Sequence, residues 1–191
     1  MSRSSDTTRP TGPDEVRAAI LEAAATHLSR EGSGASLRDI AADADVNLGL
    51  IYRYVGRKDD LIRAVLNDRA EVTSVVDSAV DTSEAVQRIF ETGARNTTYI
   101  RIVAWLLLED SRPDLLPATF PTLDAIRSNV ARDSPQELGL IAAMVMLYGW
   151  TIFGDRILES FGRSTTEGDV VYRSITGLAA RMVSTPEDFA P

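Results

Sequence analysis

The stretch of sequence that decides the fold runs from Ser36 to Leu61 and reads SLRDIAADADVNLGLIYRYVGRKDDL. It holds two short helical patterns, one beginning at Leu37 and one predicted over Leu48–Val55. The three residues Asp45-Val46-Asn47 separate them, and Gly56 ends the second. Two short helices joined by a three-residue turn indicate a helix-turn-helix motif.

Polar residues stand where each short helix begins. Ser36 is expected to accept a hydrogen bond from the amide at the third helical position, where Asp39 adds an acidic group beside the positive helix start. Asn47 is expected to cap the second helix in the same way. The local sequence therefore predicts where each of the two helices begins.

A helical wheel with Ile51 at its centre turns Val55 and Asn47 toward the core and Gly49 and Arg53 outward. The flanks are formed by Leu48, Leu50, Tyr52 and Tyr54. This set suits a helix in the DNA major groove: glycine permits close approach, arginine can fork onto a guanine edge, and leucine can touch a thymine methyl. Tyrosine hydroxyls and Lys58 can hold phosphates. Taken singly, the tyrosines also fit half-buried amphipathic positions, the basic residues Arg53, Arg57 and Lys58 fit a solvated face, and Gly49 fits a helix defect.

The rest of the chain is also helical in pattern, and we find no bounded run of alternating residues that would predict a strand. We expect an all-α protein with a flexible arm over 1–12, a three-helix helix-turn-helix domain over 13–66 and a larger helical ligand-binding and dimerisation domain over 67–191. A longer helix is predicted over Pro13–Glu31 in the first domain, and another from Lys58 to about Val76 joins the two domains. Further helices are predicted over Ser83–Ala94, Thr97–Asp110, Phe120–Ala131, Pro135–Phe161 and Glu167–Ser184.

The stretch from Val16 to Leu66 resembles the DNA-binding domain of the TetR (tetracycline-repressor) family of transcriptional regulators. The motifs that carry the resemblance are Ile20-Leu21-x-Ala23-Ala24, Leu37-Arg38-Asp39-Ile40-Ala41, Val46-x-x-Gly49-x-Ile51-Tyr52-Arg53-Tyr54 and Lys58-Asp59-Asp60-Leu61. The resemblance implies a protein that binds an operator as a homodimer and responds to a small-molecule effector.

Individual DNA contacts are implied by the same resemblance. It gives Ser36 a phosphate contact and Arg38 a base contact. Base-reading positions fall on Leu48, Gly49 and Leu50, and phosphate positions on Tyr52, Tyr54 and Lys58; Asn47 and Arg53 complete the expected interface. Two residues depart from the family pattern: Asp45 replaces the usual glycine of the turn, and Val55 replaces the usual phenylalanine. Aspartate tolerates a left-handed backbone better than most residues, so the turn is expected to survive.

Composition excludes several other kinds of site. The 191 residues include no cysteine and one histidine, His27, so disulfides, thiolate catalysis, cysteine metal sites and a histidine cluster for zinc are excluded. The net charge of −8 at first argues against a nucleic-acid partner. Between Asp45 and Asp59, however, there is no acid while Arg53, Arg57 and Lys58 supply positive charge, and screening limits the reach of distant charges to about 8–10 Å. The local patch is therefore compatible with DNA.

No secretory signal is visible, and the uncharged run Leu138–Gly154, with its three glycines, is interpreted as a buried helix rather than a membrane span. A cytoplasmic protein without membrane contact is expected.

The second domain is expected to hold both the dimer interface and the effector site. Its last two long helices carry apolar stripes suited to a partner subunit. The residues expected to line an effector cavity are aromatic or methionine: Tyr99, Trp105, Met144, Tyr148, Trp150 and Phe153. A filled core explains the same residues, and the cavity interpretation draws on the resemblance rather than on their spacing.

These observations predict a DNA-binding regulator, most simply a repressor released by a small apolar ligand, with no enzymatic activity, metal or cofactor. The alternative is a helical small-molecule-binding dimer that has no DNA-binding activity. An enzyme lacks support because Glu109 and Asp110, adjacent on a helix, diverge, and no histidine accompanies them.

Overall fold

The computed structural model describes residues 10–70, 81–109, 113–116, 127 and 130–189. Within these ranges the chain forms eight α-helices and several short 3-10 turns, and no strand occurs among them. The all-α fold predicted from the sequence is confirmed. The described residues divide into two compact units: residues 10–70 with 102–109 and 113–116, and residues 81–101 with 127 and 130–189.

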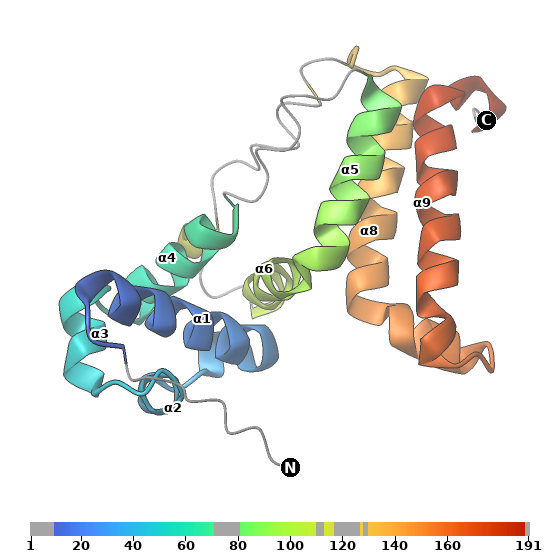
Figure 1. The fold of residues 1–191 in the computed structure, drawn as a ribbon. Coiled ribbons are helices and arrows are strands. Elements are labelled where there is room, and N and C mark those ends of the chain that lie inside the picture. Colours follow the sequence, from blue (N-terminus) through green and yellow to red (C-terminus); the bar gives the residue numbers. More distant parts are fainter. Residues whose placement is uncertain (1–9, 71–80, 110–112, 117–126, 128–129, 190–191) are drawn as a thin grey trace. The chain divides into compact units, whose positions relative to one another are not determined.

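The first unit begins with α1 (Pro13–Glu31), against which α2 (Leu37–Asp43), α3 (Leu48–Tyr54) and α4 (Lys58–Ala70) pack. Figure 1 shows α2 and α3 as two short turns of helix beside the longer α1 and α4. Their common core is formed by fully buried aliphatic side chains, among them Ile20, Leu28, Ile40, Ile51, Leu61 and Ile62. The predicted extension of α4 to Val76 and the predicted helix at Phe120–Ala131 fall largely outside the described residues.

The helix boundaries follow the capping residues closely. Ser36 accepts from the amide of Arg38 at 3.2 Å, one position earlier than predicted, so the cap is formed at the second helical residue rather than the third. Asn47 accepts from the Leu50 amide at 3.1 Å, as expected. Asp45 has φ of 52°, which confirms that this aspartate takes the left-handed turn conformation.

The first unit also contains the second half of α6 (Thr97–Glu109) and the turn Pro113–Leu115. This differs from a simple division at residue 66, because the chain returns to the first unit after leaving it. An exposed salt bridge of 3.3 Å joins Arg63 on α4 to Asp114 of the returning segment.

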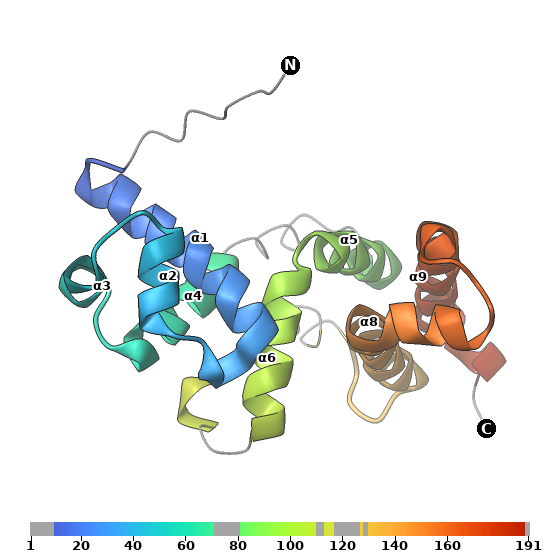
Figure 2. The ribbon, with the colours of Figure 1, turned by 90° about the horizontal axis from the view of Figure 1, so that it is seen from below.

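The second unit is built from α5 (Thr82–Arg95), α8 (Pro135–Ser160) and α9 (Gly168–Ser184), which lie side by side in Figures 1 and 2. Ser134 caps α8 by accepting from the Glu137 amide at 3.1 Å, with Pro135 at the first helical position as predicted. Asp81 caps α5 at 2.8 Å. The core of this unit is formed by Ala85, Val86, Ile89, Phe90, Ile100, Leu140, Ala143, Met144, Leu147, Ala179 and Val183.

Helix α8 is long and apolar enough to cross a membrane by length and composition alone. Only one third of its most apolar window is buried, and Leu138, Ile141, Val145 and Phe153 are more than half exposed, so the predicted burial of this helix is confirmed only in part. One such helix is weak evidence for a membrane span, because core helices of soluble proteins satisfy the same criterion.

Candidate nucleic-acid interface

Helix α3 presents one buried and several accessible side chains. Ile51 is fully buried and fixes the helix to the core, whereas Tyr52 is 52% exposed and Arg53 and Gly49 are also exposed. Leu48, Leu50 and Tyr54 are half-buried on the flanks. The wheel prediction holds for these residues, so the base-reading and phosphate-contacting candidates remain accessible on one short helix.

Two residues assigned to the core face are placed differently. Asn47 is exposed and Val55 is only half-buried. Asn47 precedes the helix and uses its side chain for the cap, so it does not follow the helical wheel.

Gly49 has a second reason for being glycine that the sequence did not reveal. A Cβ at this position would lie 3.1 Å from the Asn47 Oδ1 atom, which is tighter than most contacts of that kind. The glycine therefore leaves room for the capping oxygen.

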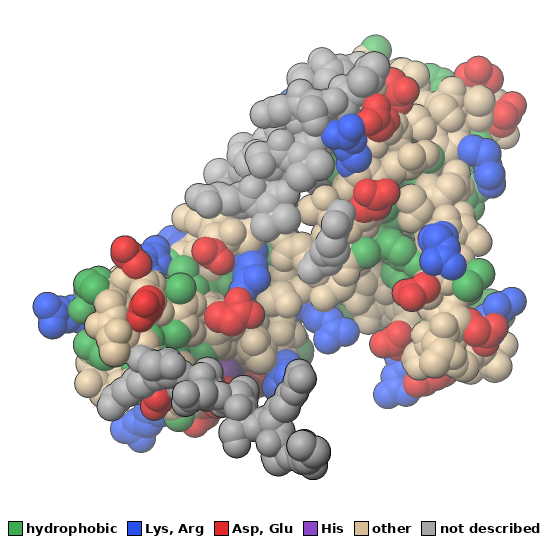
Figure 3. All heavy atoms as spheres, viewed as in Figure 1, with side chains coloured by type: hydrophobic (Ala, Val, Ile, Leu, Met, Phe, Trp, Pro, Cys, Tyr) green, Lys and Arg blue, Asp and Glu red, His purple; other side chains and the backbone are tan. Residues whose placement is uncertain are grey.

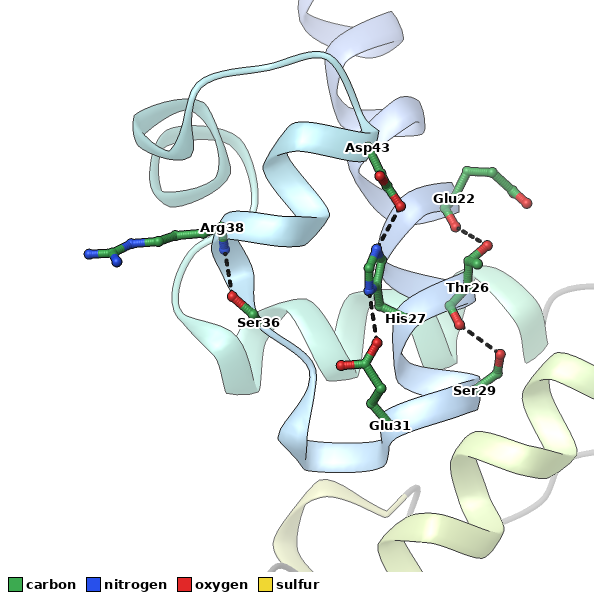
Figure 4. A network of polar contacts seen from close by, with 8 residues as sticks. All are labelled: Glu22, Thr26, His27, Ser29, Glu31, Ser36, Arg38 and Asp43. Carbon is green, nitrogen blue, oxygen red and sulfur yellow. Dashed lines mark hydrogen bonds and ion pairs between the residues drawn. The ribbon is translucent and has the colours of Figure 1, made fainter.

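The basic side chains around α3 differ in their exposure and in the groups they contact. The Arg53 guanidinium lies 5.4 Å from the centre of the Tyr54 ring, a cation–π contact that directs this arginine along the helix surface. Arg38, at the start of α2, is exposed, and Figure 4 shows its side chain extending away from α1. Lys58 is half-buried and donates to the Ser33 carbonyl, a contact that could not be predicted from the sequence.

On the face drawn in Figure 3, basic and acidic side chains are interspersed over both units. The described residues contain no group of three or more His, Asp and Glu side chains arranged to hold a metal ion. On this face the basic side chains therefore do not form an extended patch.

The six predicted effector residues do not all belong to one unit. Tyr99 and Tyr148 pack against the second core, of which Met144 is a member, and burial raises the pKa of both tyrosines. Trp150 lies 6.1 Å from the Tyr172 ring, while Phe153 is 59% exposed.

Trp105, in contrast, belongs to the first unit, where its indole Nε1 donates to the Ser29 carbonyl at 3.3 Å. This tryptophan is an α6 side chain resting on the end of α1.

Hollows occur among the described residues of the second unit. One, of about 290 Å³, lies between α8 and α9 and is lined by Trp150, Ile157, Leu158, Phe161, Arg163 and Val171. A larger and more polar groove of about 690 Å³ lies between α5 and α9, lined by Gln87, Glu91, Ala94, Tyr172, Arg173, Thr176 and Gly177. Of the predicted effector residues, Trp150 lines the smaller hollow.

His27 joins α1 to α2 (Figure 4). Its Nε2 lies 2.7 Å from Asp43 Oδ2 and its Nδ1 lies 3.1 Å from Glu31 Oε1, with only 14% of the side chain exposed. Ionised carboxylates only accept, so both contacts are hydrogen bonds when the imidazole carries two protons. The hydrogen bond to Asp43 is the main cause that raises the pKa of His27; burial opposes it and Glu31 adds to it.

Because the folded-state pKa is raised, protonated His27 stabilises the first unit. We expect this contribution to be complete below the unfolded pKa of about 6.5 and to be lost as pH rises through the folded-state value. Replacement His27→Gln should lower the melting temperature by roughly 1–4 °C at pH 6, since partly exposed ion pairs contribute about 0.5–1 kcal/mol. Thermal melts of both proteins from pH 6 to pH 9 should show the difference shrinking. A difference that stays constant over this range would contradict the assignment.

The capped two-helix motif and its exposed basic and aromatic side chains define a helix-turn-helix DNA-binding protein of the kind that regulates transcription. Residues 20–65 match the model of the TetR family of bacterial regulatory proteins. An HTH-type transcriptional repressor of Mycobacterium tuberculosis is 32% identical over 180 residues, covering 91% of this chain and 92% of that protein. A regulator of Mycobacterium bovis matches equally, and a repressor of Streptomyces coelicolor is 27% identical over 188 residues, covering 90% of this chain and 96% of that protein. The chain belongs to the TetR family.

Proposed function

We propose that this protein is a transcriptional repressor that binds an inverted-repeat operator as a homodimer, acts in the cytoplasm without enzymatic activity, and is released by a small apolar ligand. The observation that carries the DNA-binding part is α3: Ile51 anchors it, Asn47 caps it, and its remaining side chains are accessible. Two of the matched relatives are named repressors, which supports the direction of regulation.

In this proposal the accessible residues divide into two groups. Leu48, Gly49, Leu50 and Arg38 read bases, with Arg53 at the outward tip of the helix, because these side chains can reach the edges of base pairs. Ser36, Asn47, Tyr52, Tyr54 and Lys58 fix the position of the protein on the phosphates.

The division leads to a direct test. Arg38→Ala should relax the preference at one base pair and cost about 1–3 kcal/mol on the preferred site. Lys58→Ala and Tyr52→Phe should weaken binding to all sequences alike. The measurement is the affinity of each variant for a bound genomic fragment and for its single-base changes, at two salt concentrations. Equal changes in specificity for Arg38→Ala and Lys58→Ala would show that the two roles are wrongly assigned.

An exposed apolar stripe on α8 supports a dimer. Leu138, Ile141, Val145 and Ile152 are 61%, 55%, 66% and 37% exposed and lie within about 60° of one another around the helix. Contiguous apolar side chains on a surface mark an interaction site. A two-fold dimer requires two equal half-sites, so the operator is an inverted repeat with half-sites about one helical turn or a multiple of it apart.

A small apolar molecule is the proposed effector, and the second unit is its proposed binding place. Supporting this is the hollow between α8 and α9 that Trp150 lines. Tyr99, Met144 and Tyr148 belong to or pack against the core of the unit, as the filled-core interpretation expects. The predicted residues Phe153 and Trp105 contribute less, since Phe153 is largely exposed and Trp105 belongs to the first unit. The ligand must favour the arrangement that does not fit the operator.

We expect Met144→Trp, which enlarges a 7% exposed core residue, to abolish the effector response while the protein still binds DNA. Compounds that raise the melting temperature of the wild-type protein are tested for release of the operator, first with the wild type and then with the variant. Stabilising compounds that leave DNA affinity unchanged would refute ligand release and leave the second unit as a dimerisation core.

The alternative is a small-molecule-binding dimer without DNA-binding activity. Measuring the binding of duplex DNA as a function of salt concentration distinguishes it from the repressor. Steep salt dependence of binding to duplex DNA is expected for the repressor, because released counterions follow local phosphate contacts rather than the net charge of the protein. Absence of binding to any duplex at low salt would favour the alternative.

A further inference from the structure

The turn that follows α1 is held from two sides at Ser33. The Ser33 N–H donates to Glu109 Oε1 at 3.2 Å, and the Ser33 carbonyl accepts from Lys58 Nζ. Glu109 is the last residue of α6 and Lys58 is the first residue of α4. One backbone residue therefore connects the end of α6 with the cation at the start of α4.

The backbone of the turn at Gly32 allows α6 to pack closely against it. Gly32 has φ of 58°, and a Cβ on it would lie 2.7 Å from Glu109 Oε1 and 3.1 Å from Trp105 Cβ. Only glycine accommodates this backbone and this close approach together. Figure 2 shows α6 beside the end of α1, where Trp105 also donates to the Ser29 carbonyl. The contact between Glu109 and Ser33 is thus part of the close packing of α6 against the end of α1 and the turn that follows it.

Glu109 is half-buried, and its second oxygen, Oε2, is enclosed without a hydrogen-bond partner among the described residues. Leaving a buried carboxylate oxygen unpaired lowers stability, so an apolar side chain of similar length would suit the enclosed space better. Compared with such an apolar side chain, the Glu109 carboxylate contributes one interaction, the hydrogen bond that it accepts from the Ser33 N–H.

We propose that Glu109 is a positioning residue for DNA binding: by fixing Ser33, it makes the Ser33 carbonyl hold the Lys58 ammonium in place for a DNA phosphate. An ammonium has three N–H donors, and the Ser33 carbonyl takes one of them. A lysine side chain that is already held loses less conformational freedom when a phosphate binds. The inference rests on the proposed phosphate contact of Lys58.

A double-mutant cycle tests the coupling. Glu109→Met fills the same space without an acceptor, whereas Glu109→Gln keeps an oxygen that can accept from the Ser33 N–H. On a duplex selected by the wild-type protein, we expect Glu109→Met to weaken binding about three- to tenfold and Glu109→Gln to retain most of the affinity. Lys58→Ala should weaken binding and reduce the salt slope by about 0.9, the value for one phosphate contact. Adding Glu109→Met to Lys58→Ala should cause no further loss.

The matched control is Trp105→Phe. It removes the hydrogen bond from the Trp105 indole to the Ser29 carbonyl, also between α6 and α1, but leaves both Ser33 contacts. It should lower the melting temperature while DNA affinity stays within about twofold. Additive losses for Glu109→Met and Lys58→Ala, or an equal loss for Trp105→Phe, would overturn the positioning role. If Lys58→Ala itself leaves affinity and salt slope unchanged, the proposed phosphate contact fails, and the positioning role fails with it.

Discussion

Gly139→Ala is expected to disrupt the second unit, although it adds only one methyl group. A Cβ at residue 139 of α8 would lie 2.3 Å from the Met182 carbonyl oxygen and 2.9 Å from its carbonyl carbon on α9. Both atoms belong to the backbone, so the two helices must separate. Overpacking costs about 1–3 kcal/mol, and a clash with backbone atoms places this substitution at the upper end.

Because alanine has a higher helix propensity than glycine, a clash at residue 139 and an unhindered replacement elsewhere should change stability in opposite directions. Inside a helix alanine is favoured over glycine by up to about 1 kcal/mol, so an unhindered replacement stabilises the protein. Gly177, inside α9, is the matched control, because a methyl group added there would meet no heavy atom within 4 Å. Chemical denaturation should show Gly139→Ala destabilised and Gly177→Ala equal to the wild type or more stable. Equal effects of the two substitutions would contradict the close approach of α8 to α9.

Ile141→Glu is expected to give a folded monomer with greatly reduced operator affinity. Ile141 is 55% exposed in the middle of the apolar stripe of α8, so a carboxylate there costs little in the isolated subunit. In the proposed dimer the same carboxylate loses its water without gaining a partner. Binding of two half-sites by one linked dimer exceeds the affinity of a single half-site by about 10²–10⁴-fold, and that factor should be lost.

Sedimentation and circular dichroism measure the mass and the helicity of this variant, and footprinting measures its occupation of the operator. Gln87→Glu adds the same charge at an exposed position of α5 and should remain dimeric with full affinity. A dimeric Ile141→Glu variant would place the interface elsewhere. A single asymmetric half-site protected by the wild-type protein would contradict the dimer on DNA.

The helix-turn-helix could be predicted from the sequence because its determinants act over short distances. Asn47 accepts from the amide of Leu50 three residues on, and Ser36 accepts from the amide of Arg38 two residues on. Such hydrogen bonds form whenever the local backbone turns into a helix, whatever lies around it. The identity of α3 as the accessible helix followed from the same regularity, since residue spacing alone places Ile51 and Arg53 on opposite faces.

The local sequence does not predict which partner a long side chain takes. Lys58 is predicted to contact a DNA phosphate, and in the structure it donates to the Ser33 carbonyl. Trp105 is predicted to line an effector cavity, and in the structure it donates to the Ser29 carbonyl in the first unit. A long or amphipathic side chain can reach several acceptors, and its sequence neighbours do not specify which one lies nearest.

The sequence by itself determined the all-α fold, the capped motif around residues 36–61 and the family to which the chain belongs. Tertiary structure alone decided that the second half of α6 joins the first unit, that Glu109 and Lys58 meet at Ser33, and that Gly139 lies against Met182. The physical reason is the distance along the chain. Caps and helical faces depend on residues two to four positions apart, whereas these contacts join segments far apart in sequence that only the packed fold brings together.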